Sequence, residues 1–375
     1  MSIEEFNEIP HFLCDYVSKY AKSKPDDIAI IDADEGRYIT WKEFENNINM
    51  IALELLDMGY KKGDIVVSML PLLPEHIFFE YACFKIGVLF CPLDVRLKED
   101  ELIRSVKLLR EKAKMFLHPD NTETTDRHGR PRKYFFKDFA LSVKKECPFI
   151  KHFIQFSAKE DAPKGWMSIL SFLRRARQKY LQALKDPKSF KQQMERLEKA
   201  ALLVDDYDPI LIIYTTGTTG FPKPAMLTNA GIICQNLCLS KGFDVNEDDR
   251  MLVNLPPSHV GCQTEQLMST IFIGGISVIL HGFYADRTME AIENYRVTAL
   301  GEIPSLFMMS WRLPDYNNYD ISSLRFALYG GQGVSRDFLE RLSKMAPKFG
   351  TGLGLTEISG MCSYTPLDGT VDDIL

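Results

Sequence analysis

An apolar strand that runs directly into a loop of glycine and threonine is the feature that most constrains this chain. Residues 210–214 read Ile-Leu-Ile-Ile-Tyr, a continuous apolar run typical of a buried parallel strand. The next residues, 215–220, read Thr-Thr-Gly-Thr-Thr-Gly, and Phe-Pro-Lys follows, ending at Lys223. Glycines let backbone amides come close to an anion, hydroxyls donate hydrogen bonds to it, and lysine adds a positive charge. We therefore expect this loop to hold a triphosphate or a pyrophosphate.

The loop differs from the P-loop of nucleoside triphosphatases. That motif needs glycine immediately before its lysine and Ser or Thr after it, whereas Lys223 lies between Pro222 and Pro224. A flexible turn is the alternative interpretation, but flexible turns rarely combine a buried strand, two Gly-containing triplets and a Pro-Lys pair. We expect Lys223 to act in catalysis. The residues that we expect to bind the phosphates are Thr215, Thr216, Gly217, Thr218, Thr219 and Gly220.

The rest of the chain shows the alternation of helix and strand that builds a parallel α/β sheet. A helix is expected between Thr40, as its cap, and Gly59, which stops it. A strand, a helix and a strand are then expected over 64–70, 75–85 and 88–92. In such sheets, ligands favour the loops at the carboxyl ends of the strands.

Residues 158–205 have a different character, being polar, basic and helix-forming. Two amphipathic helices are expected, separated at Pro187. Nine Lys and Arg residues stand against three Asp and Glu residues between 172 and 199, so contact with a membrane surface or an acidic carrier is one interpretation. A solvated pair of helices packed by its apolar side on the main body is the interpretation that we favour. We treat 158–205 as a helical insertion between intertwined βα subdomains over 1–157 and 206–375.

Composition excludes several classes of function. The net charge of −6 and the pI near 5.8 favour neither nucleic acid nor an anionic membrane as a general partner. The acidic start lacks the pattern of a secretory signal, and the longest nearly apolar stretch, 267–280, is too short for a membrane span. Eight scattered cysteines then indicate reduced thiols in a cytoplasmic protein. We expect Cys234 and Cys238 to be small buried hydrophobes, with no metal.

The phosphate loop resembles that of the adenylate-forming superfamily, which contains acyl- and aryl-CoA synthetases, luciferases and nonribosomal adenylation domains. Four further segments resemble motifs of this superfamily in the same order, and the resemblance to acyl-CoA synthetases is the nearest. These segments are 84–94, 254–261, 328–335 and 352–357. The resemblance implies the large N-terminal α/β domain of these enzymes, with two packed βα subdomains whose parallel-rich sheets are flanked by helices. It also implies that the small C-terminal lid domain is absent from this chain.

The resemblance assigns roles to individual residues. His259 is expected between the acyl site and the thiol channel, Thr356 to donate to the α-phosphate, and Glu357 to ligate Mg²⁺, a cation that takes few protein oxygens in addition to phosphates. The expected nucleotide-binding residues are Gly331, Gln332, Gly333, Gly352, Leu353 and Gly354. Two positions depart from the superfamily pattern, because Pro224 replaces a glycine and Leu353 replaces a tyrosine that stacks on adenine.

The implied reaction joins a carboxylic acid to ATP as an acyl-adenylate and then to CoA. No aspartate lies around residues 257–259 to hold an amino acid, and Gly354 stands where acetate-activating relatives have tryptophan, so a medium-chain, alicyclic or aryl acid is favoured, in fatty acid metabolism or a related pathway. Without the lid, we expect better binding than turnover. A non-catalytic nucleotide- or acyl-binding module and luciferase-like oxidation of the adenylate remain alternatives, and a homodimer is compatible with the sequence.

Overall fold

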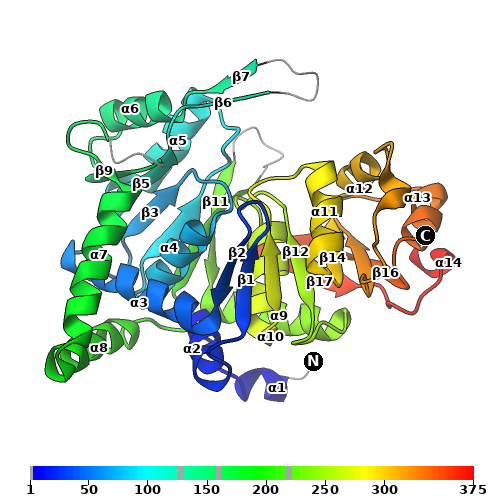
Figure 1. Ribbon diagram of the computed structural model, residues 1–375, viewed down its shortest axis with the longest axis horizontal. Coiled ribbons are helices and arrows are strands. Elements are labelled where there is room, and N and C mark those ends of the chain that lie inside the picture. Colours follow the sequence, from blue (N-terminus) through cyan, green and yellow to red (C-terminus); the bar gives the residue numbers. More distant parts are fainter. Residues whose placement is uncertain (1–2, 126–130, 158–161, 216–221) are drawn as a thin grey trace. The chain divides into compact units, whose positions relative to one another are not determined.

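The computed structural model describes residues 3–125, 131–157, 162–215 and 222–375. The chain divides into two compact units, each discontinuous in sequence (Figure 1). The first unit comprises Met1–Glu45, Pro71–Pro74 and Ala225–Leu375, and the second comprises Asn46–Leu70 and Glu75–Pro224. Both units contain a parallel-rich sheet flanked by helices, which confirms the expected fold class.

The sheet of the first unit has eight strands in the order β17-β16-β15-β14-β12-β13-β1-β2. The six inner strands are parallel, and the edge strands β17 and β2 are antiparallel to their neighbours. The strands are β1 (Ile28–Asp32), β2 (Arg37–Thr40), β12 (Arg250–Val253), β13 (Ile276–Ile279), β14 (Ala299–Glu302), β15 (Phe326–Tyr329), β16 (Lys348–Leu355) and β17 (Gly360–Tyr364).

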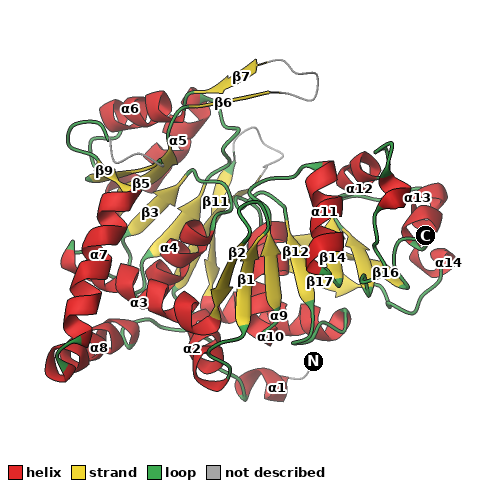
Figure 2. Ribbon diagram, viewed as in Figure 1, coloured by secondary structure: helices red, strands yellow, loops and turns green. Residues whose placement is uncertain are grey.

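Helices cover both faces of this sheet (Figure 2). Alternate strand residues such as Leu252, Leu300 and Ala327 form a core with Ile292 and Phe338 of two covering helices. The helical segments of this unit are α1 (Ile3–Asn7), α2 (Leu13–Ser23), α9 (Asn229–Gly242), η2 (Gly261–Leu267), α10 (Met268–Ile273), α11 (Ala285–Tyr295), α12 (Pro304–Ser310), η3 (Tyr316–Asn318), α13 (Arg336–Leu342), η4 (Thr356–Ile358) and α14 (Val371–Ile374).

The sheet of the second unit has seven strands in the order β11-β10-β4-β3-β5-β8-β9, and a separate hairpin pairs β6 with β7. Within this order, each strand from β10 to β9 is parallel to the next. The strands are β3 (Ile65–Ser68), β4 (Leu89–Pro92), β5 (Ala113–Pro119), β6 (Thr122–Thr125), β7 (Pro131–Tyr134), β8 (His152–Phe156), β9 (Met167–Ser168), β10 (Pro209–Thr215) and β11 (Lys223–Thr228).

The first helix beside this sheet begins where the sequence predicts. The expected cap at Thr40 is present, because the Thr40 hydroxyl accepts from the Glu43 amide while the Glu43 carboxylate accepts from the Thr40 amide. Gly59, with a φ of 83°, follows the end of that helix. The helical segments are α3 (Trp41–Asp57), α4 (Pro74–Lys85), α5 (Glu99–Leu109), η1 (Arg110–Lys112), α6 (Phe136–Glu146), α7 (Ile169–Leu184) and α8 (Pro187–Ala201).

The helix pair α7 and α8 is fixed to α3 by ion pairs. Glu54, whose side chain is only 1% exposed, contacts Arg175 at 2.5 Å and Lys179 at 2.8 Å. Asp57 contacts Lys179 at 2.7 Å and Arg196 at 2.5 Å. Three of the basic residues between 172 and 199 are therefore used within the second unit. That this helix pair is an insertion stays a prediction.

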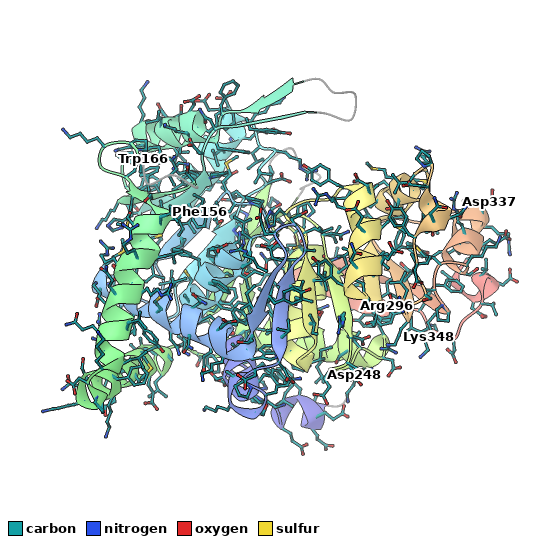
Figure 3. All side chains as sticks on the ribbon, in the orientation of Figure 1. Phe156, Trp166, Asp248, Arg296, Asp337 and Lys348 are labelled. Atoms are coloured by element: carbon teal, nitrogen blue, oxygen red, sulfur yellow. The ribbon has the colours of Figure 1, made fainter. Side chains whose placement is uncertain are left out.

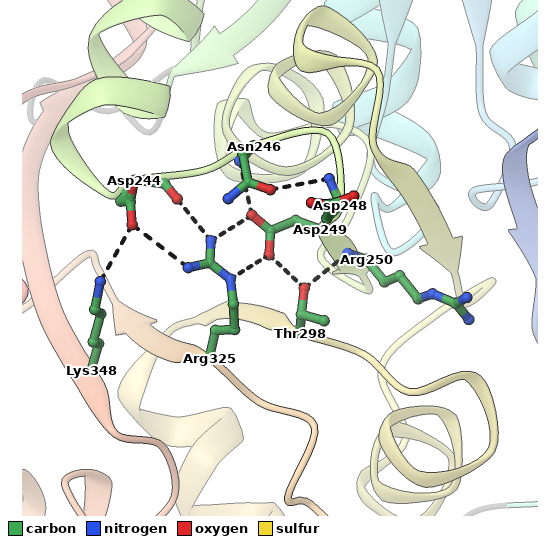
Figure 4. A network of polar contacts seen from close by, with 8 residues as sticks. All are labelled: Asp244, Asn246, Asp248, Asp249, Arg250, Thr298, Arg325 and Lys348. Carbon is green, nitrogen blue, oxygen red and sulfur yellow. Dashed lines mark hydrogen bonds and ion pairs between the residues drawn. The ribbon is translucent and has the colours of Figure 1, made fainter. Parts of the chain in front are cut away.

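A polar network joins the amino-terminal ends of strands in the first unit (Figure 4). The buried carboxylate of Asp249 accepts two hydrogen bonds from Arg325, at 2.9 and 2.7 Å, and one from the Thr298 hydroxyl at 2.6 Å. Lys348 and Arg325 also contact Asp244. Figure 3 shows Asp248 and Lys348 on this side of the sheet, opposite the edge where parallel strands place ligands.

No helix within the described residues is both long and apolar enough to cross a membrane.

Candidate functional site

The carboxyl ends of four parallel strands form one edge of the sheet in the first unit. The strand pairing aligns Glu302 of β14 with Tyr329 of β15, and Tyr329 with Thr351 of β16. Three motifs that the sequence assigns to acyl and nucleotide binding lie at this edge. Residues 254–261 follow β12, residues 328–335 include the end of β15, and residues 352–357 follow Thr351 in β16. The structure therefore brings these three motifs together at the edge that favours ligands.

The segment after β12 turns sharply and enters a π-helix. The Pro256 carbonyl accepts from the His259 amide at 3.1 Å, and the Gln263 amide group donates to the Pro257 carbonyl at 3.0 Å, which closes the turn. His259 is exposed at this turn. The seven residues of η2 follow this turn. π-helical turns are rare in proteins as a whole, but those that occur are often found at functional sites. The role expected for His259, beside an acyl ligand, stays a prediction.

The segment after β15 is an exposed glycine turn. Gly331, Gln332 and Gly333 are all exposed, and Gly331 has a φ of 88°, a conformation that favours glycine. A side chain added at Gly331 would meet Ile303 at 3.4 Å. An accessible backbone next to an apolar side chain suits the edge and face of a base, so the predicted adenine role of this turn is compatible with its geometry.

The glycines of β16 let the antiparallel strand β17 approach closely. A Cβ atom at Gly354 would lie 2.5 Å from the Gly360 carbonyl oxygen, and one at Gly352 would lie 2.4 Å from the Met361 sulfur. Between them, Leu353 is 69% exposed. Strand pairing alone therefore requires glycine at these two positions, whether or not a nucleotide binds. Leu353, in contrast, offers an apolar surface for a base.

Thr356 and Glu357 follow β16 in the short turn η4. Glu357 is exposed, Thr356 is partly buried, and the neighbouring Leu355 and Ile358 are exposed apolar side chains. Among the described residues, no group of three or more His, Cys, Asp or Glu side chains is arranged to hold a metal ion. One exposed carboxylate fits Mg²⁺ because this cation commonly takes one or two protein carboxylates and completes its shell with phosphates and water.

A buried polar cluster behind this edge escaped the sequence analysis. The Asn254 amide group donates to Glu302 at 2.6 Å, and the Gln266 amide group donates to the Gly301 carbonyl at 2.7 Å. The second carboxylate oxygen of Glu302 has no hydrogen-bond partner among the described residues. Burial raises the pKa of Glu302 to about 7. The sequence signal that could have revealed this cluster is a polar residue, Glu302, inside the otherwise apolar segment 299–303.

The phosphate loop belongs to the second unit. Thr215 ends β10 and is partly buried, Lys223 begins β11 and is exposed, and the residues between 216 and 221 lie outside the described residues. Of the predicted phosphate ligands, Thr216, Gly217, Thr218, Thr219 and Gly220 are therefore not placed. The Tyr214 hydroxyl donates to the Ser105 carbonyl at 2.6 Å, which anchors the strand that leads into the loop.

Curated proteins similar to this chain include CoA ligases and a CoA synthase. A 4-coumarate–CoA ligase of Humulus lupulus, CCL1, is 23% identical over 365 residues, covering 95% of this chain and 59% of that protein. A feruloyl-CoA synthase of an Amycolatopsis species is 26% identical, covering 86% and 55%. The medium-chain fatty-acid–CoA ligase of Escherichia coli is 25% identical, covering 92% and 56%. The chain thus spans little more than half the length of these relatives.

Solved structures share the fold at lower sequence identity. The anthranilate CoA ligase AuaEII in complex with anthranoyl-AMP has a TM-score of 0.79 at 16% identity, covering 97% of this chain and 64% of that one. The N-terminal domain of FACL13 from Mycobacterium tuberculosis has a TM-score of 0.70 at 20% identity, covering 95% and 79%. The sequence pattern of the family described as "AMP-binding enzyme" matches residues 17–374. This chain, predicted from its motifs to be adenylate-forming, therefore belongs to the family of AMP-binding enzymes.

Proposed function

We propose that this chain is the nucleotide- and acyl-binding part of an AMP-forming acid–thiol ligase. The protein would activate a carboxylic acid with ATP as an acyl-adenylate and transfer the acyl group to CoA. The observation that carries the proposal is the convergence of three predicted motifs, including Thr356 and Glu357, at one carboxyl edge of the parallel sheet of an AMP-binding enzyme. The CoA-ligase names of the curated relatives support the same reaction.

Adenylation makes two demands on the protein. The substrate carboxylate must attack the α-phosphate in line, and the charge that develops on the phosphates must be neutralised. The Thr356 hydroxyl would donate to the α-phosphate. For the second unit, the proposal is that Lys223 and its loop bind phosphate groups. Glu357 would hold Mg²⁺, which supplies charge neutralisation on the phosphate oxygens when bound.

The apolar side chains around the edge support a nucleotide and an acid of more than minimal size. Leu353, Leu355 and Ile358 are exposed in the first unit and Ile303 lies against the glycine turn. Exposed apolar side chains that gather beside polar groups are typical of ligand sites. We therefore favour a medium-chain, alicyclic or aryl acid over acetate, and the names 4-coumarate, feruloyl and medium-chain fatty acid among the relatives agree with this range.

The proposal is tested by incubating the full-length gene product with Mg·ATP and a panel of carboxylic acids, with and without CoA. Pyrophosphate release that depends on an acid, with AMP and an acyl-CoA formed when CoA is present, is the expected result. A folded protein that binds nucleotide but releases no pyrophosphate with any acid class would instead be a non-catalytic binding module. Oxygen uptake coupled to adenylate formation would indicate the luciferase-like alternative.

The metal role of Glu357 has its own test. Glu357→Gln should reduce acid-dependent pyrophosphate release by on the order of 100-fold, because removal of one group that stabilises transition-state charge has effects of this size. The apparent requirement for Mg²⁺ should also rise. The exposed Glu340 on α13 provides the matched control, Glu340→Gln, which should retain the wild-type rate. Retained activity in Glu357→Gln would remove this residue from the metal role.

A further inference from the structure

Helix α9 carries two cysteines one helical turn apart. Cys234 and Cys238 occupy positions i and i+4 of this helix and therefore lie on the same face of it. The sequence predicted two small buried hydrophobes, but both residues are partly exposed. Both thiols are free, and a hydrogen bond joins them. The first unit thus contains a partly exposed pair of thiols in mutual contact.

The surroundings of this pair disfavour the thiolate form. Burial raises the pKa of the Cys238 thiol, and the neighbouring Cys234 raises it further. Cysteines that act singly as nucleophiles or redox sensors need the opposite, a lowered pKa and free access. Alkylation or peroxide oxidation at one sulfur is therefore not the chemistry that this pair suits. Its distinguishing property is that two sulfurs lie side by side.

The helical spacing separates two kinds of two-thiol chemistry. Side chains four residues apart on a helix have Cβ atoms about 5–6 Å apart, whereas a disulfide needs a Cβ separation of roughly 3.5–4.5 Å. Closing a disulfide would thus distort α9, whose start is capped by the Thr228 hydroxyl accepting from the Gly231 amide at 3.1 Å. One atom placed between the two sulfurs removes this conflict, because it lengthens the bridge. The helix therefore favours a bridging atom over a disulfide.

The number and softness of the ligands restrict the bridging atom. Thiolates are soft ligands and select soft centres over Mg²⁺ or Ca²⁺. A structural zinc ion takes four protein ligands, but nowhere in the described part of the chain do three or more His, Cys, Asp or Glu side chains form a group that could hold a metal ion. A soft centre that needs only two sulfurs remains. Trivalent arsenic that already carries one carbon substituent has this requirement, because it has two further bonds to form.

We propose that Cys234 and Cys238 form a dithiol site for a soft, thiophilic centre that two sulfurs satisfy, with monosubstituted trivalent arsenicals as the ligand class. With phenylarsine oxide, two S–H bonds and the As=O bond break and two As–S bonds form. The two hydrogens and the oxygen leave as one molecule of water. No electrons are transferred, so the step requires no oxidant. The site goes beyond the proposed ligase function and does not depend on it.

Intact-mass spectrometry of the full-length gene product with one equivalent of phenylarsine oxide tests the site. An excess of a monothiol would remove arsenic that is held through a single sulfur. We expect the wild type to keep one phenylarsenic group under these conditions and to release it to a small dithiol such as dithiothreitol. Cys234→Ser and Cys238→Ser should each bind the arsenical on the order of 100-fold more weakly, because the second contact is lost. Proteolysis of the wild-type adduct should place the arsenic on the peptide that contains α9, a result that needs no variant.

The two other cysteines that keep some exposure supply matched controls. Cys362 of β17 is exposed, and Cys14 of α2 is partly exposed. Cys14→Ser and Cys362→Ser should retain the wild-type affinity, and thermal unfolding would confirm that each variant is folded. Weakened binding in either control, retained binding in Cys234→Ser or Cys238→Ser, or no adduct with the folded wild type would overturn the proposal. Ready formation of a disulfide between Cys234 and Cys238 in diamide would also overturn it, since the pair would then need no bridging atom.

Discussion

At the scale of single residues, the glycines of β16 separate a packing requirement from a ligand requirement. Gly354→Ala would place a methyl group 2.5 Å from the Gly360 carbonyl oxygen and 2.8 Å from the Met361 Cα, and these backbone atoms cannot rotate away. We expect a loss of about 1–3 kcal/mol in the free energy of unfolding, typical of overpacking. Urea denaturation would measure this loss. Gly333→Ala is the control, because no described atom beyond its chain neighbours lies within 4 Å of its Cβ position. Equal stability of the two variants would contradict the expectation.

A second residue, Glu302, should make stability depend on pH. Burial raises its pKa to about 7 from an ordinary 4.5. Because the folded state holds this proton more tightly than the unfolded state, the associated stability is complete below the unfolded pKa and is lost as pH rises through the folded pKa. The loss should be on the order of 3 kcal/mol by about pH 8. Glu302→Gln, which cannot ionise, should lack this part of the pH dependence.

Urea denaturation at a series of pH values from about 4.5 to 8 would measure the effect of Glu302→Gln. The difference in unfolding free energy between wild type and variant should change in favour of the variant as pH rises. The exposed Glu290 on α11 supplies a control, since Glu290→Gln should follow the wild-type curve. Parallel curves for wild type and Glu302→Gln would show that Glu302 does not titrate in this range.

Sequence reasoning named candidate residues that lie in motifs, and it missed the buried polar residues behind them. Leu353, Thr356 and Glu357 lie in motifs whose order along the chain carries the information. Glu302 is a single polar residue inside an apolar strand, and its environment depends on partners distant in sequence. Asn254, for example, is 48 positions from Glu302. No local pattern specifies such a contact, so these groups could only be found from the fold.

At the scale of elements, the ion pairs of α3 should hold the helix pair α7 and α8 in place. Glu54→Gln removes the charge that Arg175 and Lys179 contact. Because both basic side chains are about half exposed and can be hydrated, we expect a modest cost of about 1–2 kcal/mol. In Glu54→Gln, amide hydrogen exchange in α7 and α8 should be faster than in the wild type, and the strands β3 and β5 serve as the reference.

The helix α8 itself supplies the control for the Glu54 variant. Glu195 contacts Lys191 at 3.9 Å in an exposed pair one helical turn apart, and such pairs contribute little to stability. Glu195→Gln should therefore leave the exchange of α7 and α8 unchanged. Exchange in Glu54→Gln that also matched the wild type would mean that apolar packing, from residues such as Phe172 and Ala176, fixes the helix pair alone.

Helices and strands were predictable to different depths. The start of α3 at its Thr40 cap and the separation of α7 from α8 at Pro187 follow from local rules for caps and proline. The π-helical turn η2 has no comparable signal in 261–267. The pairing of β1 with β13 joins residues about 250 positions apart, as Ile31 with Val278. Strand order depends on such long-range pairing, which hydrophobic periodicity does not encode.

At the scale of the whole molecule, each of the two units has its own sheet and its own apolar core. A chain built in this way need not unfold in a single step, so stability has to be measured for each unit. The network around Asp249 offers a selective perturbation, because it joins strand beginnings in the first unit only. It also lies at the amino-terminal ends of these strands, away from the carboxyl edge that carries the candidate site.

Asp249→Asn should destabilise the first unit without changing the candidate site. The substitution leaves the Arg325 guanidinium facing a neutral amide. The side chain at position 249 is only 1% exposed. We expect a loss of about 1–3 kcal/mol, because the charge-assisted hydrogen bonds to the buried Asp249 carboxylate are weakened, while Arg325 keeps its contact with Asp244. The amides of β12, β14 and β15 should lose protection against hydrogen exchange, while β5 and β8 of the second unit serve as the internal reference. Asp320→Asn, which disrupts the exposed pair with Arg296, should change the stability little. Affinity for AMP should remain at the wild-type value in both variants, and weakened AMP binding in folded Asp249→Asn would show that the two edges of the sheet are coupled.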